Sequence, residues 1–385
     1  MNIEVRAKDR AQQSKLSIID CDFHPRLTHE QLKPFISNQW WSYLQTYGNR
    51  QRHGQAKGYN YPKIVPQASR RDAWPPSGGP PGSDVDFCRE QHLDFYGIDY
   101  GILTPLGSST GNGDQNVELS IALASAANDG QLAHWTDKEP RLKPSIVVPY
   151  EDGVASAAEV RKRAANKEFK QVFLLSKIAE AHGRKRYWPI YEAAAEAGLP
   201  IGIHAFGYGG WPLTNSGYPS FYIEEMTEHA TGAQAMVTSM IMEGIFERWP
   251  ELKIVLIECG FGWLPALGWR LDKHWKRLKD EVPHLKMAPS EYIKKHFWVT
   301  TQPMEEMDNP DHLLEVMNWI GFDRIMFSSD YPHWDFDDPF VSLPPSLTDE
   351  QRRKIYAGNA RALYGWTDGE KARRRGHERN PAGRP

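Results

Sequence analysis

Short runs of β-branched and other apolar residues alternate with helical patterns along most of the chain. Apolar runs of this length are typical of strands buried on both faces of a parallel sheet, with helices covering those faces. We expect strands at residues 16–20, 98–104, 145–149, 170–175, 200–204, 253–258, 297–301 and 324–328. Helices are expected between them, at residues 117–128, 154–165, 187–197 and 224–249, within 263–295, and at 348–356. Eight strands that alternate with helices predict an α/β fold, specifically a (β/α)8 TIM-type barrel, and a doubly wound open sheet is the alternative.

Two stretches interrupt this alternation. Residues 28–87, after the first strand, are long, polar and rich in Gly, Pro and aromatic side chains, and residues 206–222, after the fifth strand, have the same character. Loops this long within a compact domain are usually functional or mobile. We interpret both as lid loops over a site, and contacts between subunits are the competing explanation. Trp211, in the second loop, is a candidate for substrate binding.

The strand and helix pattern occupies residues 16–366, which we interpret as one barrel domain with residues 28–87 as an inserted lid region. Residues 1–15 are polar and charged and lack the apolar stretch of a targeting signal, so we expect a flexible segment. Residues 367–385 are basic, contain Gly and Pro and have no apolar face, which predicts a disordered basic tail.

The composition excludes several classes of protein. The chain has 385 residues with a net charge of -3, which gives no reason to expect a nucleic acid or an anionic membrane as partner. No stretch approaches the length and apolarity of a membrane span. The three cysteines form no C-x-x-C pair, so a disulfide framework and a thiolate zinc site are not expected. We expect a cytoplasmic homo-oligomer, and a hetero-oligomer with a related subunit is the alternative.

Side chains that bind metals follow four of the predicted strands. Strand one runs into Asp22 and His24, strand five ends on His204, strand six ends on Glu258, and strand eight runs into Asp330. The carboxyl ends of barrel strands converge on one mouth, and alternate residues of a strand face the same side. Each residue alone could be a helix cap or a loop residue, but together they predict a divalent metal site. Imidazole and carboxylate suit zinc, manganese and iron.

These strand ends lie within longer motifs that resemble a known family, the amidohydrolase superfamily, in the branch related to aminocarboxymuconate-semialdehyde decarboxylase. The resemblance extends from about residue 18 to about residue 365. Its motifs are IDCDFHP at 19–25, IHA at 203–205, GIFERWPELKIV at 244–255, ECGFGWLPAL at 258–267, WRLDKH at 269–274, FSSDYPHWD at 327–335 and GNARALYG at 358–365. The motifs are specific for the family and much less specific for one reaction.

The resemblance implies particular metal ligands. In that family an H-x-H pair after strand one, a His after strand five and an Asp after strand eight hold the metal, and His24, His204 and Asp330 match those positions. Asp22 stands in place of the first His, a replacement also found as a carboxylate in several decarboxylases.

Two further positions depart from the common pattern. Glu258 stands where many members have a catalytic His, and His229 in the preceding helix resembles a His that accompanies Glu in such members. His229 could otherwise be a histidine on a helix surface. The implied metal ligands are therefore Asp22, His24, His204, His229, Glu258 and Asp330. Asp330, Glu258 and His229 are the catalytic candidates, and His333 is a second candidate for substrate binding.

The leading hypothesis for function is hydrolysis or decarboxylation of a small organic molecule, through a metal-bound water or a metal-polarised carboxylate. Six possible ligands allow one crowded ion or two ions, and a carboxylate-rich set favours manganese or iron over zinc. A dinuclear iron or manganese–iron monooxygenase is therefore the alternative reaction. A non-catalytic partner subunit that keeps the barrel is the third hypothesis.

Overall fold

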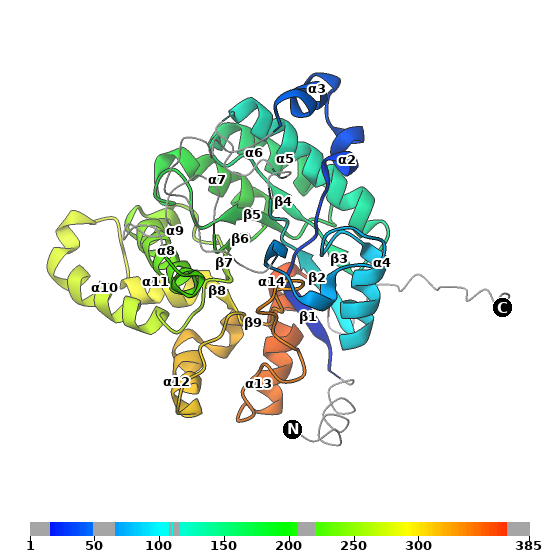
Figure 1. Cartoon of the computed structure of the whole chain (residues 1–385). Coiled ribbons are helices and arrows are strands. Elements are labelled where there is room, and N and C mark those ends of the chain that lie inside the picture. Colours follow the sequence, from blue (N-terminus) through cyan, green and yellow to red (C-terminus); the bar gives the residue numbers. More distant parts are fainter. Residues whose placement is uncertain (1–15, 49–65, 108–109, 111–115, 207–219, 368–385) are drawn as a thin grey trace, which may run out of the picture.

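The computed structural model describes residues 16–48, 66–107, 110, 116–206 and 220–367. Parallel strands form the centre, and helices surround them (Figure 1). The first sheet contains β1 (Ile18–Phe23), β2 (Ile98–Leu103) and β3 (Leu142–Lys143). The second contains β4 (Ser145–Val147), β5 (Gln171–Leu175), β6 (Ile201–His204), β7 (Ile254–Ile257), β8 (Phe297–Thr300) and β9 (Ile325–Met326).

The two sheets are parts of one closed barrel. β3 and β4 are separated only by Pro144, which has no N–H to donate to a ladder, so one barrel strand is divided into two short strands. At the other junction, the N–H of Cys21 donates to the carbonyl of Phe327 at 3.0 Å, and the N–H of His24 donates to that of Tyr331 at 2.9 Å. These bonds join β1 to the segment after β9, so the predicted (β/α)8 barrel is confirmed and the open sheet is excluded.

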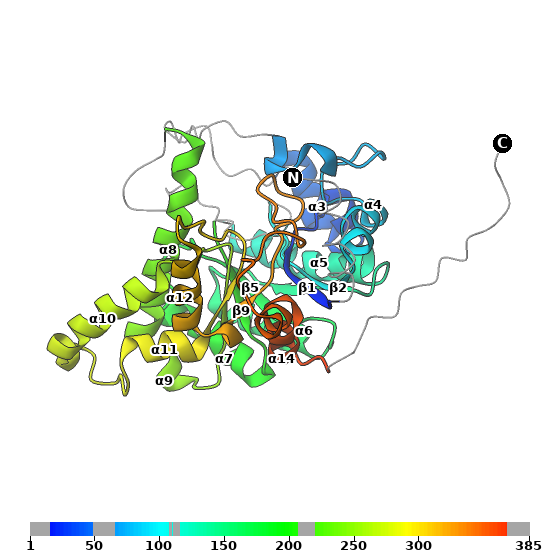
Figure 2. The ribbon, with the colours of Figure 1, turned by 90° about the horizontal axis from the view of Figure 1, so that it is seen from below.

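Most helices lie close to the predicted positions. The helices are α5 (Val117–Gln131), α6 (Gly153–Ala164), α7 (Trp188–Ala197), α8 (Tyr222–Met242), α9 (Ile245–Arg248), α10 (Leu264–Leu278), α11 (Pro289–His296), α12 (Pro310–Ile320), α13 (Asp349–Arg353) and α14 (Asn359–Tyr364), of which α12 and α14 were not predicted. Figure 2 shows α8, α10 and α12 on one side of the barrel and α3, α4 and α5 on the other. The single helix expected at 224–249 is wrong, because Gly244 has a φ of 75° and divides it into α8 and α9.

The apolar core has two parts. Side chains between the strands and the surrounding helices form the larger part. A smaller cluster fills the barrel interior from alternate positions of several strands, including Ile19 and Cys21 on β1 and Val255 and Ile257 on β7. Trp366 packs at the same cluster and stacks on a ring of β2. The interior is thus a packed core, and only the mouth at the carboxyl ends of the strands is available for a site.

The region expected to be an inserted lid is partly helical. It contains α2 (His29–Leu32), α3 (Asn38–Tyr47), short 3-10 turns and the start of α4 (Val85–Cys88). Residues 49–65 and 207–219, which include Trp211, lie outside the described residues, as do 1–15 and 368–385. A lid function, a flexible N-terminal segment and a disordered tail therefore stay predictions. Within the described ranges, no helix is long and apolar enough to cross a membrane.

Candidate metal centre

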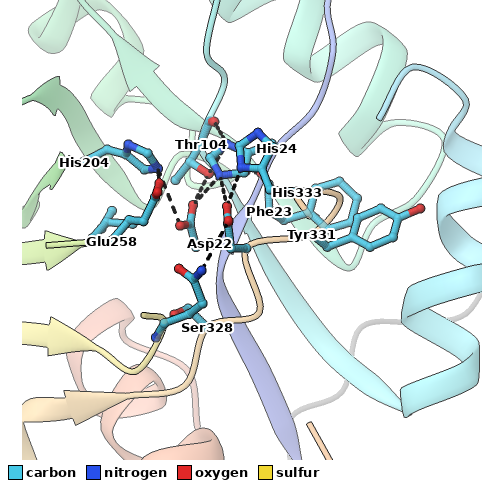
Figure 3. A network of polar contacts seen from close by, with 12 residues as sticks. Asp22, Phe23, His24, Thr104, His204, Glu258, Ser328, Tyr331 and His333 are labelled. Carbon is cyan, nitrogen blue, oxygen red and sulfur yellow. Dashed lines mark hydrogen bonds and ion pairs between the residues drawn. The ribbon is translucent and has the colours of Figure 1, made fainter. Parts of the chain in front are cut away.

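Side chains from four strand ends meet at the mouth of the barrel (Figure 3). Asp22, His24, His204 and Glu258 each offer a ligand atom, and these atoms lie within 4.8 Å of one another. A second group, His24, Glu258, Asp330 and His333, meets the same criterion and shares two members with the first. The five side chains expected at strand ends are therefore gathered in one place, and all are buried.

A bulge near the end of β1 directs Asp22 toward this centre. Asp20 pairs with Gly101 and Phe23 pairs with Leu103, so β1 has one extra residue between the two pairs. Such a bulge turns the side chains of a strand. Asp20 faces away toward His92, whereas Asp22 lies 3.3 Å from the imidazole of His24.

The two imidazoles are oriented by main-chain carbonyl groups. Nδ1 of His24 lies 2.8 Å from the carbonyl of Thr104, and Nδ1 of His204 lies close to the carbonyl of Ala205. A carbonyl only accepts, so each Nδ1 donates and each Nε2 is left to face the centre. Nε2 of His24 is 2.7 Å from Asp330 Oδ1, and Nε2 of His204 is 2.8 Å from Glu258 Oε2. This is the orientation that a metal-binding histidine requires.

Two carboxylate residues of the centre have an unusual backbone conformation. Glu258 has a φ of 54° and Asp330 a φ of 60°, both in the left-handed region that residues with a side chain rarely adopt. Such residues cost about 1–3 kcal/mol each and cluster at functional sites. The N–H of Glu258 donates to Thr300 Oγ1 at 3.2 Å, which helps to hold this conformation.

The carboxylates and imidazoles perturb one another strongly. Burial raises the pKa of Asp330 to about 8, and the charge of Glu258 adds to the rise. Burial would also raise the pKa of Glu258, but His204 lowers it to about 2. Burial alone would lower the pKa of His204, but the nearby Glu258 and Asp22 carboxylates raise it to about 10.

The donor set fits a divalent cation. Asp22 Oδ2 is buried without a hydrogen-bond partner, and His204 Nε2 lies near two carboxylates without a well-directed bond to either. Buried polar atoms normally have partners, so these lone pairs are explained if they are ligand positions. Three carboxylates with imidazoles suit manganese or iron at least as well as zinc.

His229 lies behind the centre. It belongs to α8, is 7% exposed, and places Nδ1 3.7 Å from Glu258 Oε1. Burial lowers its pKa, so it is held as neutral imidazole. It is absent from both ligand groups found among the described residues. Its position suits proton exchange with Glu258 better than direct metal binding.

Three further side chains contact the centre, and two of them, Thr104 and Gln302, were not expected from the sequence. His333, expected to bind substrate or to orient Asp330, places Nδ1 2.7 Å from Asp330 Oδ1. Thr104 donates its hydroxyl to Asp22 Oδ1 at 2.5 Å, and Gln302 Nε2 lies 3.4 Å from Asp330 Oδ2. Thr104 is the last residue of the predicted strand 98–104, and Gln302 directly follows the predicted strand 297–301. Side chains at the carboxyl ends of barrel strands converge on the mouth, so the same rule that located the ligands could have located both of these polar residues.

A closed barrel with imidazole and carboxylate ligands at its strand ends defines a metal-dependent barrel enzyme. The chain belongs to the amidohydrolase family, whose model, described as Amidohydrolase, matches residues 19–366. It is similar to the gamma-resorcylate decarboxylase of Polaromonas sp. (strain JS666), with 26% identity over 304 residues, which cover 73% of this chain and 87% of that protein. It is also similar to the 2-amino-3-carboxymuconate-6-semialdehyde decarboxylase of Dictyostelium discoideum, with 23% identity over 188 residues that cover 46% and 48% of the two chains.

Solved structures agree on the fold. The 5-carboxyvanillate decarboxylase of Novosphingobium aromaticivorans DSM 12444, complexed with manganese and 4-hydroxy-3-methoxy-5-nitrobenzoic acid, has a TM-score of 0.67 and 19% identity. The match covers 92% of this chain and 97% of that structure. The expected family, its decarboxylase branch, a metal-dependent enzyme and a divalent metal are confirmed. These relatives give no support to a monooxygenase, a non-catalytic subunit, or zinc or iron in particular.

Proposed function

We propose that this chain is a metal-dependent decarboxylase of a small aromatic carboxylate. The observation that carries the proposal is the meeting of three carboxylates and two imidazoles at the mouth of the barrel, in a buried centre with unsatisfied lone pairs. The similarity to gamma-resorcylate decarboxylase over most of the chain supports decarboxylation over hydrolysis.

The ligand assignment follows from the same geometry. Asp22, His24, His204 and Glu258 would hold the ion, because their ligand atoms lie within 4.8 Å of one another, and Asp330 is within the same reach of His24 and Glu258. A bound divalent ion would polarise the substrate carboxylate and the oxygen next to it. Manganese is the metal we favour, because the donor set is rich in carboxylates.

Side chains of the protein would supply the proton that decarboxylation requires. Decarboxylation breaks the bond between the ring carbon and the carboxylate, the electron pair stays on that carbon, CO2 leaves, and a proton must reach the carbon. We assign this donor role to Asp330, which is fully buried and whose Oδ2 has only a long contact with Gln302. Glu258 and His229, whose Oε1 and Nδ1 are 3.7 Å apart, would exchange the proton onward.

The test combines metal content with turnover. The manganese-reconstituted protein is assayed for CO2 release from gamma-resorcylate and 5-carboxyvanillate, and for hydrolysis of neutral esters and lactones. Asp330→Asn should lower decarboxylation about 10²–10⁴-fold, because a positioned acid contributes that much. Asp349→Asn, at an exposed helix start, is the matched control and should behave as wild type. Hydrolysis of the neutral compounds without CO2 release from either acid would make the protein a hydrolase.

A further inference from the structure

A pocket opens beside the metal centre. His24 and His333 of the centre line it together with Arg26, Gln67 and Ser69. The remaining wall consists of prolines and Leu106. The segment that carries Gln67 is attached to the loop after β9, because the N–H of Arg70 donates to the carbonyl of Pro332 at 3.0 Å. The pocket is therefore a built extension of the site, with one cationic side chain in its wall.

Arg26 is held in this pocket by neutral partners. Its main-chain N–H donates to the carbonyl of Gly82 at 2.6 Å, and its guanidinium donates to the side-chain oxygen of Gln67. A Cβ added at Gly107 would lie 3.5 Å from Nη1 of Arg26, so the glycine leaves space beside the guanidinium. Within the described ranges, Arg26 has no ion pair with a carboxylate.

Several buried arginines of the described residues are paired with carboxylates. Arg89 and Arg141 both pair with Glu139, at 2.7 and 2.8 Å, and Arg163 pairs with Glu159 at 2.6 Å. A guanidinium in a pocket normally finds an anion, because its charge is costly to leave unpaired away from water. The half-buried Arg26, with only an amide oxygen on its charged group, has a free position for an anionic ligand.

The net charge of the centre bears on the role of the Arg26 guanidinium. Asp22 and Glu258 carry two negative charges, which a divalent ion would neutralise, and Asp330 holds a proton in its proposed role as donor. The centre would then neither attract nor repel an anionic substrate. The guanidinium at the pocket wall would supply the attraction for an arriving carboxylate.

We propose that Arg26 recognises the negatively charged group of the substrate, so that the site selects an organic carboxylate over a neutral amide or ester of the same shape. A planar guanidinium binds a carboxylate through two parallel N–H···O bonds, and the contact with Gln67 would be exchanged for them. This inference rests on the proposed function, since it names the charge class of the substrate of that site.

The test uses direct binding rather than turnover. Manganese-loaded wild type, Arg26→Gln, Arg26→Lys and Arg352→Gln are titrated calorimetrically with benzoate and with benzamide, which differ in charge but hardly in shape. Arg352 is the matched control, because it is a half-buried arginine on α13 whose guanidinium also donates to a neutral acceptor, the carbonyl of Pro344. Arg26→Gln should weaken benzoate binding about 10–100-fold and leave benzamide binding unchanged within about threefold. Arg26→Lys should recover part of the loss.

Three results would overturn the assignment: equal benzoate affinity in Arg26→Gln and Arg352→Gln, a wild type that prefers benzamide, or loss of manganese from Arg26→Gln. The last would show a structural role. If the wild type binds benzoate through Arg26 but decarboxylates neither aromatic acid, the proposed function fails and the recognition of anions stands.

Discussion

Asp20 links two segments of the barrel mouth that carry proposed metal ligands, the end of β1 and the loop after β9. Its carboxylate is fully buried. Oδ1 accepts from the N–H of Ser329 at 2.9 Å and from that of Asp22 at 3.2 Å. Oδ2 accepts from the hydroxyl of Ser329 at 2.5 Å and contacts Nε2 of His92 at 2.7 Å. One side chain thus joins the residue next to Asp330 to the backbone of Asp22.

Asp20→Ala should be costly for both folding and metal binding. It leaves several buried donors without an acceptor, Nε2 of His92 among them, at about 1–3 kcal/mol each. These terms overlap, so we expect the free energy of unfolding to fall by about 4 kcal/mol. Groups that orient metal ligands typically change metal affinity about 10–100-fold when they are removed, and we expect a loss in that range for manganese.

Urea unfolding of the metal-free protein and a manganese titration measure the two effects separately. Ser329→Ala removes one of the donors and leaves the acceptor in place, so it should cost about 1 kcal/mol. The reasoning is refuted if Asp20→Ala unfolds within about 1 kcal/mol of wild type and binds manganese within about twofold of it.

Two further predictions address metal number and acid stability. Glu258→Gln should hold about one manganese ion per chain, as the wild type does, with turnover independent of oxygen; about two ions in wild type and oxygen-dependent turnover would favour the dinuclear alternative. His182 is buried, and burial lowers its pKa to about 4. A lowered pKa contributes stability above the unfolded value of about 6.5, and that contribution is lost as the pH falls through about 4. The difference of roughly 2.5 units corresponds to about 3 kcal/mol, so His182→Gln should lose less unfolding free energy than wild type between about pH 7 and pH 4; parallel urea-midpoint profiles for the two proteins would contradict this.

The barrel and most of the centre could be predicted because both depend on local pattern. Apolar runs locate the strands, and parallel strands in a barrel must bring their carboxyl ends together. His204 and Glu258 therefore meet although 53 intervening residues separate them in the sequence. Residue type and strand position were sufficient, and no knowledge of distant contacts was needed.

The details that could not be predicted depend on backbone conformation. Simple alternation treats Asp20 and Asp22 alike, and only the bulge separates the carboxylate that faces the centre from the one that faces His92. The contact of His333 with Asp330 likewise depends on the left-handed conformation of Asp330, a conformation that its residue type does not favour. The division of the long helix at Gly244 had a local signal, a glycine within the helical pattern, but a single glycine is often tolerated there.

A bound divalent cation would offset several unfavourable features of the centre at once. Burial of three carboxylates, left-handed backbone at Glu258 and Asp330, and lone pairs without partners on Asp22 and His204 all cost free energy in the metal-free chain. A divalent cation would satisfy the lone pairs and neutralise most of the charge in one step. The stability of the barrel is then linked to metal occupancy, because a ligand that binds only the folded state stabilises it by mass action.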